Sequence, residues 1–308
     1  MKIYSFMSLN QNIQESLSKS GIHLEIHSME QITDKQLKKA FLENDILIIG
    51  LHHHMDAMWL KEIATPKIVA TLSIGVDHID SLYFQHPMIQ VLHCVYGNTL
   101  SVAEHILALI LALNKNVISS YHYVMGNTTQ MNSITSTENS YQTLGLIGAG
   151  HISQKLIEIM SGFHMNVLIY TAHLEQHQDL IEKKVRFVSL ETLLKSADII
   201  SINVPNTDST KNLLSKECLS LVKKNATIIN TSRLEVADTM ALLELARTYP
   251  SIKVGMDVDI DKYKKEFQQV GDNVLLTPHI AGKTKAAQYK MQLELVNQIL
   301  KCLEKNNI

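Results

Sequence analysis

Short apolar runs alternate along the chain with segments in which apolar residues recur at helical spacing. This alternation is typical of parallel strands joined by helices, because strands covered on both faces are apolar throughout. The pattern therefore predicts an α/β protein. In the first part of the chain it predicts strands at 2–6, 45–50, 67–72 and 91–94, with helices at 11–18, 34–43 and 56–63.

A second series of such runs begins at residue 143. It predicts strands at 143–147, 166–170, 199–204, 227–231, 252–258 and 273–277. Strands of this number with helices between them fit a dinucleotide-binding fold. The sequence thus predicts a second α/β domain, distinct from the first.

Three further segments stand outside these two series. Residues 101–117 predict a long helix that is apolar on nearly every side and is expected to be buried, against both domains or a second subunit. Residues 126–140 are rich in Asn, Thr and Ser and predict an exposed loop. The last predicted helix, 285–303, is expected to return to the first domain, because an apolar residue recurs at every fourth position: Ala287, Met291, Leu295, Ile299 and Leu303.

Composition narrows the class of protein. A chain of 308 residues is long enough for two domains, and a net charge of −2 without a basic block argues against a nucleic-acid partner. The apolar stretch at 106–113 is shorter than the roughly 18 residues of a membrane helix, and residues 1–6 have a strand pattern without a secretory core. Cys94, Cys218 and Cys302 lack metal-site spacing. We therefore expect a cytoplasmic protein with no membrane partner.

A glycine-rich turn follows the predicted strand at 143–147 and opens a helix. Gly148 permits a tight turn, and Gly150 lets the backbone approach a pyrophosphate. The amides of His151 and Ile152 at the helix start are placed to bind its oxygens. Ser153 occupies the position of the third glycine and is still small. The pattern favours a dinucleotide site over an ordinary glycine turn.

The end of the next predicted strand bears on the choice of cofactor. A carboxylate expected there would bind the ribose 2′-hydroxyl of NAD, but this chain has Thr171 and His173. Thr171 can hydrogen-bond a 2′-phosphate and His173 can add positive charge, which favours NADPH. Glu175 is nearby and would favour NADH if it occupied the site. Ordinary loop residues are the remaining interpretation.

Two strand ends carry side chains suited to the chemistry of a small acid. Arg233 follows the strand at 227–231, and a guanidinium binds a carboxylate through two parallel hydrogen bonds. His279 follows the last predicted strand, and an imidazole with a pKa of about 6.5 can donate a proton to a carbonyl oxygen. A surface arginine and a structural histidine are the alternatives, but the position at strand ends favours a site.

The order of these motifs resembles that of the D-isomer-specific 2-hydroxyacid dehydrogenases. The matching segments cover nearly all of the chain: 73–80, 98–105, 143–148, 197–200, 204–205, 230–233, 257–258 and 277–282. The resemblance implies a Rossmann-type dinucleotide-binding domain, 98–282, inserted in a smaller flavodoxin-like substrate domain, 1–97 and 283–308. It also implies an active site in the cleft and a homodimer formed through the cofactor domain and its long helix.

The resemblance also assigns roles to residues. Backbone amides of Ser73, Ile74 and Gly75 would help Arg233 to hold the substrate carboxylate, and Asp257 would contact the nicotinamide amide. Further residues would belong to the cofactor site: Val204, Pro205, Thr210, Thr231 and Gly282.

This chain departs from the family pattern next to both reactive side chains. The glutamate that orients the histidine in the family is replaced by Lys262, so Asp261 is the predicted orienting carboxylate, with Asp259 as the alternative. The glycine that follows the arginine in the family is Leu234 here.

Three consecutive histidines follow the strand at 45–50. In the matched fold this loop faces the substrate, so His52 or His53 is expected to add positive charge there. A metal site is not expected, because the side chains of His52, His53 and His54 would diverge along an extended segment.

The sequence as a whole predicts an NAD(P)H-dependent oxidoreductase that interconverts a small 2-oxoacid and its D-2-hydroxyacid. His279 would supply the proton and the nicotinamide the hydride. A non-catalytic dinucleotide-sensing module is the alternative, favoured by Lys262 and Leu234. Oxidation of a small inorganic or one-carbon anion by the same arginine clamp is a third possibility.

Overall fold

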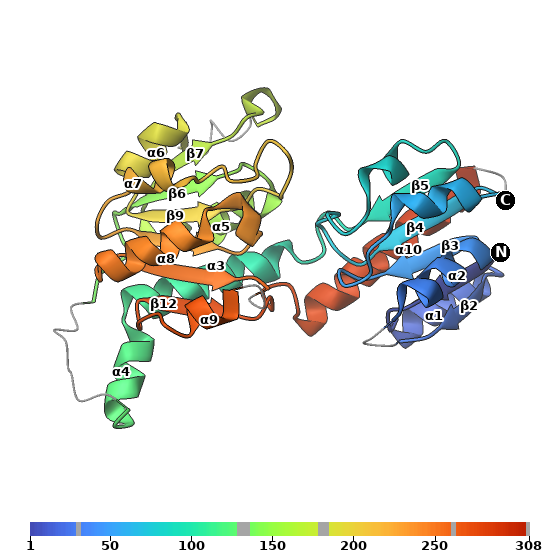
Figure 1. Cartoon of the computed structure of the whole chain (residues 1–308), viewed down its shortest axis with the longest axis horizontal. Helices are drawn as coiled ribbons and strands as arrows, with labels where there is room; N and C mark the ends of the chain where they lie inside the picture. Colours follow the sequence, from blue (N-terminus) through green and yellow to red (C-terminus); the bar gives the residue numbers. More distant parts are fainter. Residues whose placement is uncertain (29–31, 128–135, 178–184, 260–262, 306–308) are drawn as a thin grey trace. The chain divides into compact units, whose positions relative to one another are not determined.

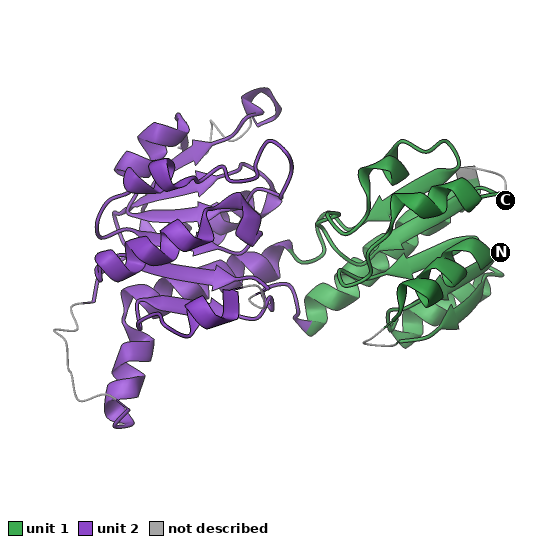
Figure 2. Cartoon of the chain, viewed as in Figure 1, with its two compact units in different colours: residues 1–98, 285–308 green, residues 99–284 purple. Residues whose placement is uncertain are grey.

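The computed structural model describes residues 1–28, 32–127, 136–177, 185–259 and 263–305. The chain divides into two compact units (Figure 2): unit 1 comprises Met1–Asn98 and Lys285–Ile308, and unit 2 comprises Thr99–Thr284. The boundaries predicted from the sequence, after residues 97 and 282, lie one and two residues before these. Each unit contains its own parallel sheet.

Unit 1 contains a five-stranded parallel sheet in the order β2-β1-β3-β4-β5, which is the flavodoxin-like order. Its strands are β1 (Lys2–Ser5), β2 (His23–Ile26), β3 (Ile46–Ile49), β4 (Lys67–Thr71) and β5 (Ile89–His93). Its helices are α1 (Gln11–Lys19), α2 (Asp34–Glu43) and α10 (Lys285–Lys305), with 3₁₀ turns η1 (Ala57–Glu62) and η2 (Ser81–Phe84). The predicted helix at 56–63 is therefore a 3₁₀ turn.

Helix α10 packs on the sheet of unit 1, as its apolar spacing predicts (Figure 1). Leu295 and Ile299 are 0% exposed and lie in one cluster with Ile3 and Ile46. Burying each such side chain contributes about 1.5–3 kcal/mol to folding. The final segment of the chain therefore completes the core that the first segment begins.

Helix α10 also binds the segment that leads out of unit 1. The Glu294 carboxylate accepts hydrogen bonds from the backbone amides of Val95, Tyr96 and Gly97 at 2.7, 3.2 and 3.0 Å. Gly97 packs directly on the helix, because a Cβ there would lie 2.7 Å from the backbone nitrogen of Met291. This contact requires glycine at position 97.

Unit 2 contains a seven-stranded parallel sheet in the order β12-β11-β10-β9-β6-β7-β8, the doubly wound order of Rossmann folds with one added strand. The strands are β6 (Thr143–Ile147), β7 (Asn166–Tyr170), β8 (Val185–Phe187), β9 (Ile199–Ile202), β10 (Thr227–Asn230), β11 (Lys253–Asp257) and β12 (Val274–Thr277). The helices are α3 (Thr99–Asn114), α4 (Val117–Val124), α5 (His151–Ile159), α6 (Leu190–Ser196), α7 (Lys216–Ser220), α8 (Thr239–Thr248) and α9 (Lys264–Phe267).

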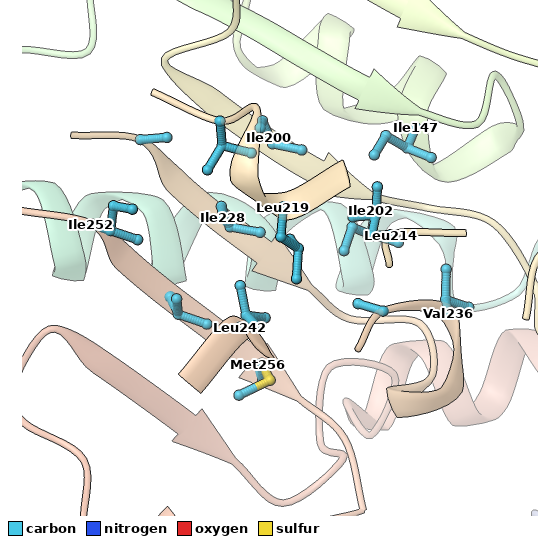
Figure 3. Packing of buried hydrophobic residues seen from close by; sticks show 14 of the residues in the cluster. Ile147, Ile200, Ile202, Leu214, Leu219, Ile228, Val236, Leu242, Ile252 and Met256 are labelled. Carbon is cyan, nitrogen blue, oxygen red and sulfur yellow. The ribbon is translucent and has the colours of Figure 1, made fainter. Parts of the chain in front are cut away.

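A cluster of buried aliphatic side chains covers one face of this sheet (Figure 3). Ile200, Ile228 and Met256 come from neighbouring strands, and Leu219 and Leu242 come from α7 and α8. All five are at most 2% exposed. The predicted parallel α/β organisation is therefore confirmed in both units.

The long predicted helix is interrupted. Helix α3 ends at Asn114, Asn116 has a left-handed φ of 51°, and α4 then begins at Val117. Helix α3 is buried against α5, β10 and β11 within unit 2, whereas no residue of α4 is buried. Among the described residues no single helix is long and apolar enough to cross a membrane, although α3 and α4, bent by 56°, pass that test as a pair.

Candidate active site

The glycine turn lies between β6 and α5, at the point where the strand order of the sheet reverses. Gly148 has a φ of 103°, and a Cβ there would lie 2.8 Å from the Asn203 carbonyl oxygen. Both facts exclude a side chain at this position. Gly150 precedes α5, and no atom lies within 4 Å of the place where its Cβ would stand. The turn is therefore tight against the sheet and open on the side of the helix start.

Ser153 does more than fill the place of the third glycine. Its hydroxyl donates to the Gly148 carbonyl oxygen at 2.6 Å and accepts from the Asn203 amide at 2.9 Å. The Asn203 side-chain oxygen in turn accepts from Ser201 at 3.0 Å. Ser153 is 0% exposed. The hydroxyl ties the glycine turn to the end of β9, a link that the sequence signals only by the unusual serine.

The turn fits the pyrophosphate of a dinucleotide. The backbone amides at the start of α5, those of His151 and Ile152, belong to a helix end whose dipole favours anions. The open space at the Cβ position of Gly150 lets a ligand reach them. The geometry of this chain thus suits the cofactor that its sequence predicts.

Thr171 and His173 lie in the loop after β7, as predicted. The Thr171 hydroxyl accepts the His173 amide at 3.2 Å, and His173 Nδ1 lies 3.7 Å from a carboxylate oxygen of Glu175. The side chains of His173 and Glu175 are 68% and 67% exposed. An imidazole and a carboxylate thus lie side by side in this loop.

The remaining predicted cofactor residues lie in loops that follow strands of unit 2. The Thr210 hydroxyl donates to the Pro205 carbonyl at 2.5 Å and accepts a hydrogen bond from the Thr207 amide at 2.8 Å. Its side chain therefore stabilises the loop at 205–210. Val204 Cγ1 lies 2.9 Å from where a Cβ on Gly148 would stand. Thr231 follows β10, and Gly282 lies in the loop between β12 and α10.

The loop that carries His279 is held by Asp257 at the end of β11. Asp257 is 0% exposed, and its carboxylate accepts hydrogen bonds from the Thr277 hydroxyl at 2.5 Å and the amides of Ile280 and Ala281 at 2.9 and 2.7 Å. His279 itself has a left-handed φ of 53°. Non-glycine residues adopt this conformation rarely, so the surrounding hydrogen bonds maintain it. Contact of Asp257 with the nicotinamide stays a prediction.

Arg233 lies in the loop after β10, and Asn230 shapes that loop. The Asn230 side-chain oxygen accepts the Ser232 amide at 3.0 Å, and its nitrogen donates to the Arg233 carbonyl at 3.0 Å. Leu234, which replaces the family's glycine, is 7% exposed and belongs to the core of unit 2. The substitution is therefore accommodated by packing, away from the polar face of the loop.

Arg233 and His279 are close enough to interact electrostatically. The pKa of His279 is lowered, mainly by burial and next by the positive charge of Arg233, while Asp257 and Asp259 act in the opposite direction. The two reactive side chains named by the sequence thus come together within unit 2. Two carboxylates were predicted to orient His279, and of these Asp259 is among the described residues. Asp261 lies outside the described residues, as does Lys262.

In unit 1 the predicted substrate loop is stabilised by its own side chains. The Ser73 hydroxyl donates to the Gly75 carbonyl at 2.7 Å, while Thr71 Oγ1 lies 2.9 Å from both Ser73 Oγ and His78 Nε2. Ser73 and His78 are buried, and Ile74 is partly exposed. The sequence predicted no role for His78, and only the fold shows its contact with Thr71.

The structure separates the three histidines after β3. His53 is 8% exposed, and its Nδ1 accepts the Gly50 amide at 2.9 Å. Burial lowers its pKa and so favours the neutral imidazole, which leaves His52 as the member of the predicted pair that could add positive charge. His52 and His54 are exposed, and among the described residues no group of His, Cys, Asp or Glu is arranged to hold a metal ion.

Together these features define an α/β dinucleotide-dependent dehydrogenase, with a glycine turn at the switch point and an arginine and a histidine after β10 and β12 of the same sheet. The comparisons with known proteins agree. The model of the "D-isomer specific 2-hydroxyacid dehydrogenase, NAD binding domain" matches residues 107–281. The chain belongs to the D-isomer specific 2-hydroxyacid dehydrogenase family and is a nicotinamide-dependent oxidoreductase of the 2-hydroxyacid and 2-oxoacid class.

Relatives cover almost the whole chain. Hydroxypyruvate reductase of Thermotoga maritima is 30% identical over 90% of this chain and 90% of its own length, and glyoxylate reductase of Thermofilum pendens is 30% identical over 83% and 78%. Among solved structures, an acyclic imino acid reductase in complex with NADPH and D-Arg has a TM-score of 0.89 at 26% identity, covering 99% of this chain and 98% of that one. D-lactate dehydrogenase of Aquifex aeolicus with NAD and lactic acid has a TM-score of 0.81 at 28% identity, covering 99% and 96%.

The glycine turn yields a test that separates folding from cofactor binding. Gly148→Ala should destabilise the protein by about 1–3 kcal/mol, because the new Cβ meets the backbone of Asn203 at a strained φ. Gly150→Ala should leave stability nearly unchanged, because its Cβ enters open space, yet weaken dinucleotide binding by crowding the pyrophosphate. Thermal unfolding and cofactor titration of both variants measure the two effects. Equal destabilisation by both would contradict this account of the turn.

Proposed function

We propose that this protein reduces a small 2-oxoacid to its D-2-hydroxyacid, with Arg233 binding the substrate carboxylate and His279 exchanging the proton. The observation that supports the proposal is that both residues follow strands of the same sheet, β10 and β12, and that the charge of Arg233 is among the causes that lower the pKa of His279. A fixed cation binds the acid, and a titratable imidazole beside it serves the carbonyl oxygen.

The reaction requires one hydride and one proton. When bound, the nicotinamide cofactor supplies the hydride for the carbonyl carbon. Protonated His279 then gives its proton to the carbonyl oxygen, so the carbonyl becomes a hydroxyl and the imidazole becomes neutral. In the oxidation direction neutral His279 accepts the same proton. Arg233 holds the acid in place and keeps its charge throughout.

We also propose that unit 1 contributes the backbone amides of Ser73, Ile74 and Gly75 to the carboxylate and that exposed His52 adds positive charge. Support comes from the family resemblance and from the hydrogen bonds that stabilise the 71–78 loop. Asp259 supports the protonated form of His279, because its charge raises the pKa of the imidazole. The role of Asp261 as orienting carboxylate remains part of the proposal.

The pH dependence should reveal the protonation state of His279. Burial and Arg233 lower its pKa from 6.5, so the imidazole of the free protein is mostly neutral at pH 7. We expect kcat/KM for reduction to fall as pH rises through a midpoint below 6.5, and kcat/KM for oxidation to rise through the same midpoint. A bound carboxylate offsets the charge of Arg233, so the midpoint in kcat should lie higher than in kcat/KM. Initial rates from pH 4.5 to 9 test this, and identical midpoints for kcat and kcat/KM in the reduction direction would contradict it.

The activity is tested with a panel of 2-oxoacids that includes glyoxylate, hydroxypyruvate and pyruvate, each with NADH and with NADPH. The expected result is loss of reduced-cofactor absorbance and formation of the D-enantiomer of a chiral product. Adding an amine to the panel distinguishes imine reduction, the activity named for one structural neighbour. Tight dinucleotide binding without turnover of any acid would favour the non-catalytic sensing module instead.

We propose a preference for NADPH, supported by Thr171 and by the absence of an acidic residue directly at the end of β7. His173 would add positive charge to the loop when protonated, although Glu175 lies beside it. The ratio of kcat/KM with the two cofactors tests the proposal, and equal or better efficiency with NADH would contradict it. His173→Glu should shift the ratio toward NADH, because an acid repels the 2′-phosphate.

We further propose a homodimer, with α4 contributing to its interface, and a cytoplasmic location. The support for the dimer is a group of exposed apolar side chains on and around α4: Val117, Tyr121, Tyr123, Val124 and Met125. Light scattering should give twice the mass of the chain, and Val124→Glu should reduce it to the monomer. A monomeric wild-type protein would contradict the dimer.

The three free cysteines fit a reducing compartment, which supports the proposed cytoplasmic location.

A further inference from the structure

A histidine on helix α3 lies behind the loop that carries His279, and the sequence prediction assigned it no role. His105 Nε2 lies 2.9 Å from the Thr277 hydroxyl oxygen and 3.7 Å from Oδ1 of Asp257. Its side chain is 19% exposed, whereas that of Asp257 is 0% exposed. The imidazole is therefore part of the polar cluster that surrounds the Asp257 carboxylate.

The direction of these hydrogen bonds follows from the number of available protons. A threonine hydroxyl has one proton, and that of Thr277 is donated to the Asp257 carboxylate at 2.5 Å. The Thr277 oxygen can then only accept from His105, so the proton of His105 is on Nε2. The chain of donors runs from His105 through Thr277 to Asp257.

These hydrogen bonds fix the orientation of the Asp257 carboxylate, whose oxygens bind the loop that carries His279. With Thr277 engaged on one side, the carboxylate accepts the amides of Ile280 and Ala281, which immediately follow His279. On α3, one helical turn before His105, the Ser101 hydroxyl donates to the Ala281 carbonyl at 2.6 Å. Two side chains on one face of α3 therefore hold the loop.

We propose that His105 is a positioning residue for His279: by donating to Thr277 it orients the Asp257 carboxylate, which keeps His279 in its left-handed conformation. The left-handed φ of 53° at His279 needs such support, because it is unfavourable for a residue with a side chain. The part of this inference that concerns turnover rests on the proposed function, whereas the part that concerns the loop does not.

The test compares His105→Leu, which removes the donor, with His105→Gln, whose amide nitrogen can replace Nε2–H. Glu104→Leu on the exposed side of the same helix is the matched control. The first readout is amide hydrogen exchange of Ile280 and Ala281 in the cofactor-free protein. We expect at least tenfold faster exchange in His105→Leu, and exchange near wild type in the other two variants.

The second readout is an NMR titration of the His279 imidazole in the same proteins. Loosening the loop exposes the ring and weakens the burial that lowers its pKa, so its pKa should rise toward the ordinary value in His105→Leu alone. The third readout is turnover: kcat should fall roughly 10- to 100-fold with little change in cofactor affinity, because small displacements of a reacting group cost rate.

The outcomes separate this inference from the proposed function. Unchanged exchange and an unchanged His279 pKa in His105→Leu would overturn the positioning role. Faster exchange in a protein that turns over none of the acids would support the positioning role and count against the proposed activity. If His105→Leu does not fold, Thr277→Val removes the central hydroxyl in a similar volume and should give the same changes. Wild-type exchange in that variant would overturn the inference.

Discussion

Replacing His279 with alanine should lower kcat for 2-oxoacid reduction by roughly 10²–10⁴-fold, the usual contribution of a general acid. Dinucleotide affinity should stay near that of the wild type, because His279 is not among the residues proposed to bind the dinucleotide and the glycine turn at Gly148–Gly150 lies in another loop, between β6 and α5. Steady-state rates and a cofactor titration on the same preparation measure both quantities.

A second variant keeps this test free of backbone effects. His279 has a φ of 53°, which asparagine adopts more readily than most residues. His279→Asn should therefore preserve the loop and still lose the rate, whereas His23→Ala at an exposed position of unit 1 should leave the rate unchanged. A wild-type rate in either His279 variant would remove this side chain from the mechanism.

Arg233→Met should have the second large effect. Loss of a charge-paired carboxylate contact costs about 2–5 kcal/mol, which corresponds to roughly 30- to 5,000-fold in kcat/KM. Arg233→Lys should recover part of this loss, because an ammonium keeps the charge but cannot form two parallel hydrogen bonds. The kinetic constants for the best 2-oxoacid of the panel provide the measurement.

The same variants carry an internal check on the site geometry. The charge of Arg233 lowers the pKa of His279, so Arg233→Met should raise that pKa and shift the falling limb of the pH profile to higher pH. Arg233→Lys should leave the limb close to its wild-type position. If Arg233→Met changes neither kcat/KM nor the pH profile, then Arg233 does not act at this site.

The sheet strands with continuous apolar runs were predictable from the sequence. β3, β6 and β10 are buried along nearly their whole length, and such strands are predominantly apolar, with polar residues of β6 and β10 confined to their ends. The two strands that the sequence analysis missed, β2 and β8, lie at the edges of their sheets. An edge strand is short and partly exposed, so it carries both apolar and polar side chains. The strands His23–Ile26 and Val185–Phe187 are of this kind and lack the continuous apolar run that marks a central strand.

Local geometry decided the end of the long helix. The apolar pattern continues from α3 into α4, and periodicity alone does not reveal the left-handed residue Asn116 that separates them. The sequence likewise does not distinguish His53 from the adjacent His52 and His54. Its burial and its hydrogen bond from the Gly50 amide make it a neutral acceptor.

The residues of the candidate site also divide into those that the sequence predicts and those that only the fold brings together. Gly148, Arg233 and His279 were identifiable from the sequence, because each follows a strand and each is a residue type that its chemistry requires. The sequence by itself determined the fold class and the family and predicted these three positions, since all of them depend on local pattern and residue type. Only the tertiary structure brought His105, Thr277 and Asp257 together and tied Ser153 to Asn203, because hydrogen bonds between residues far apart in the chain depend on how the strands are ordered in the sheet.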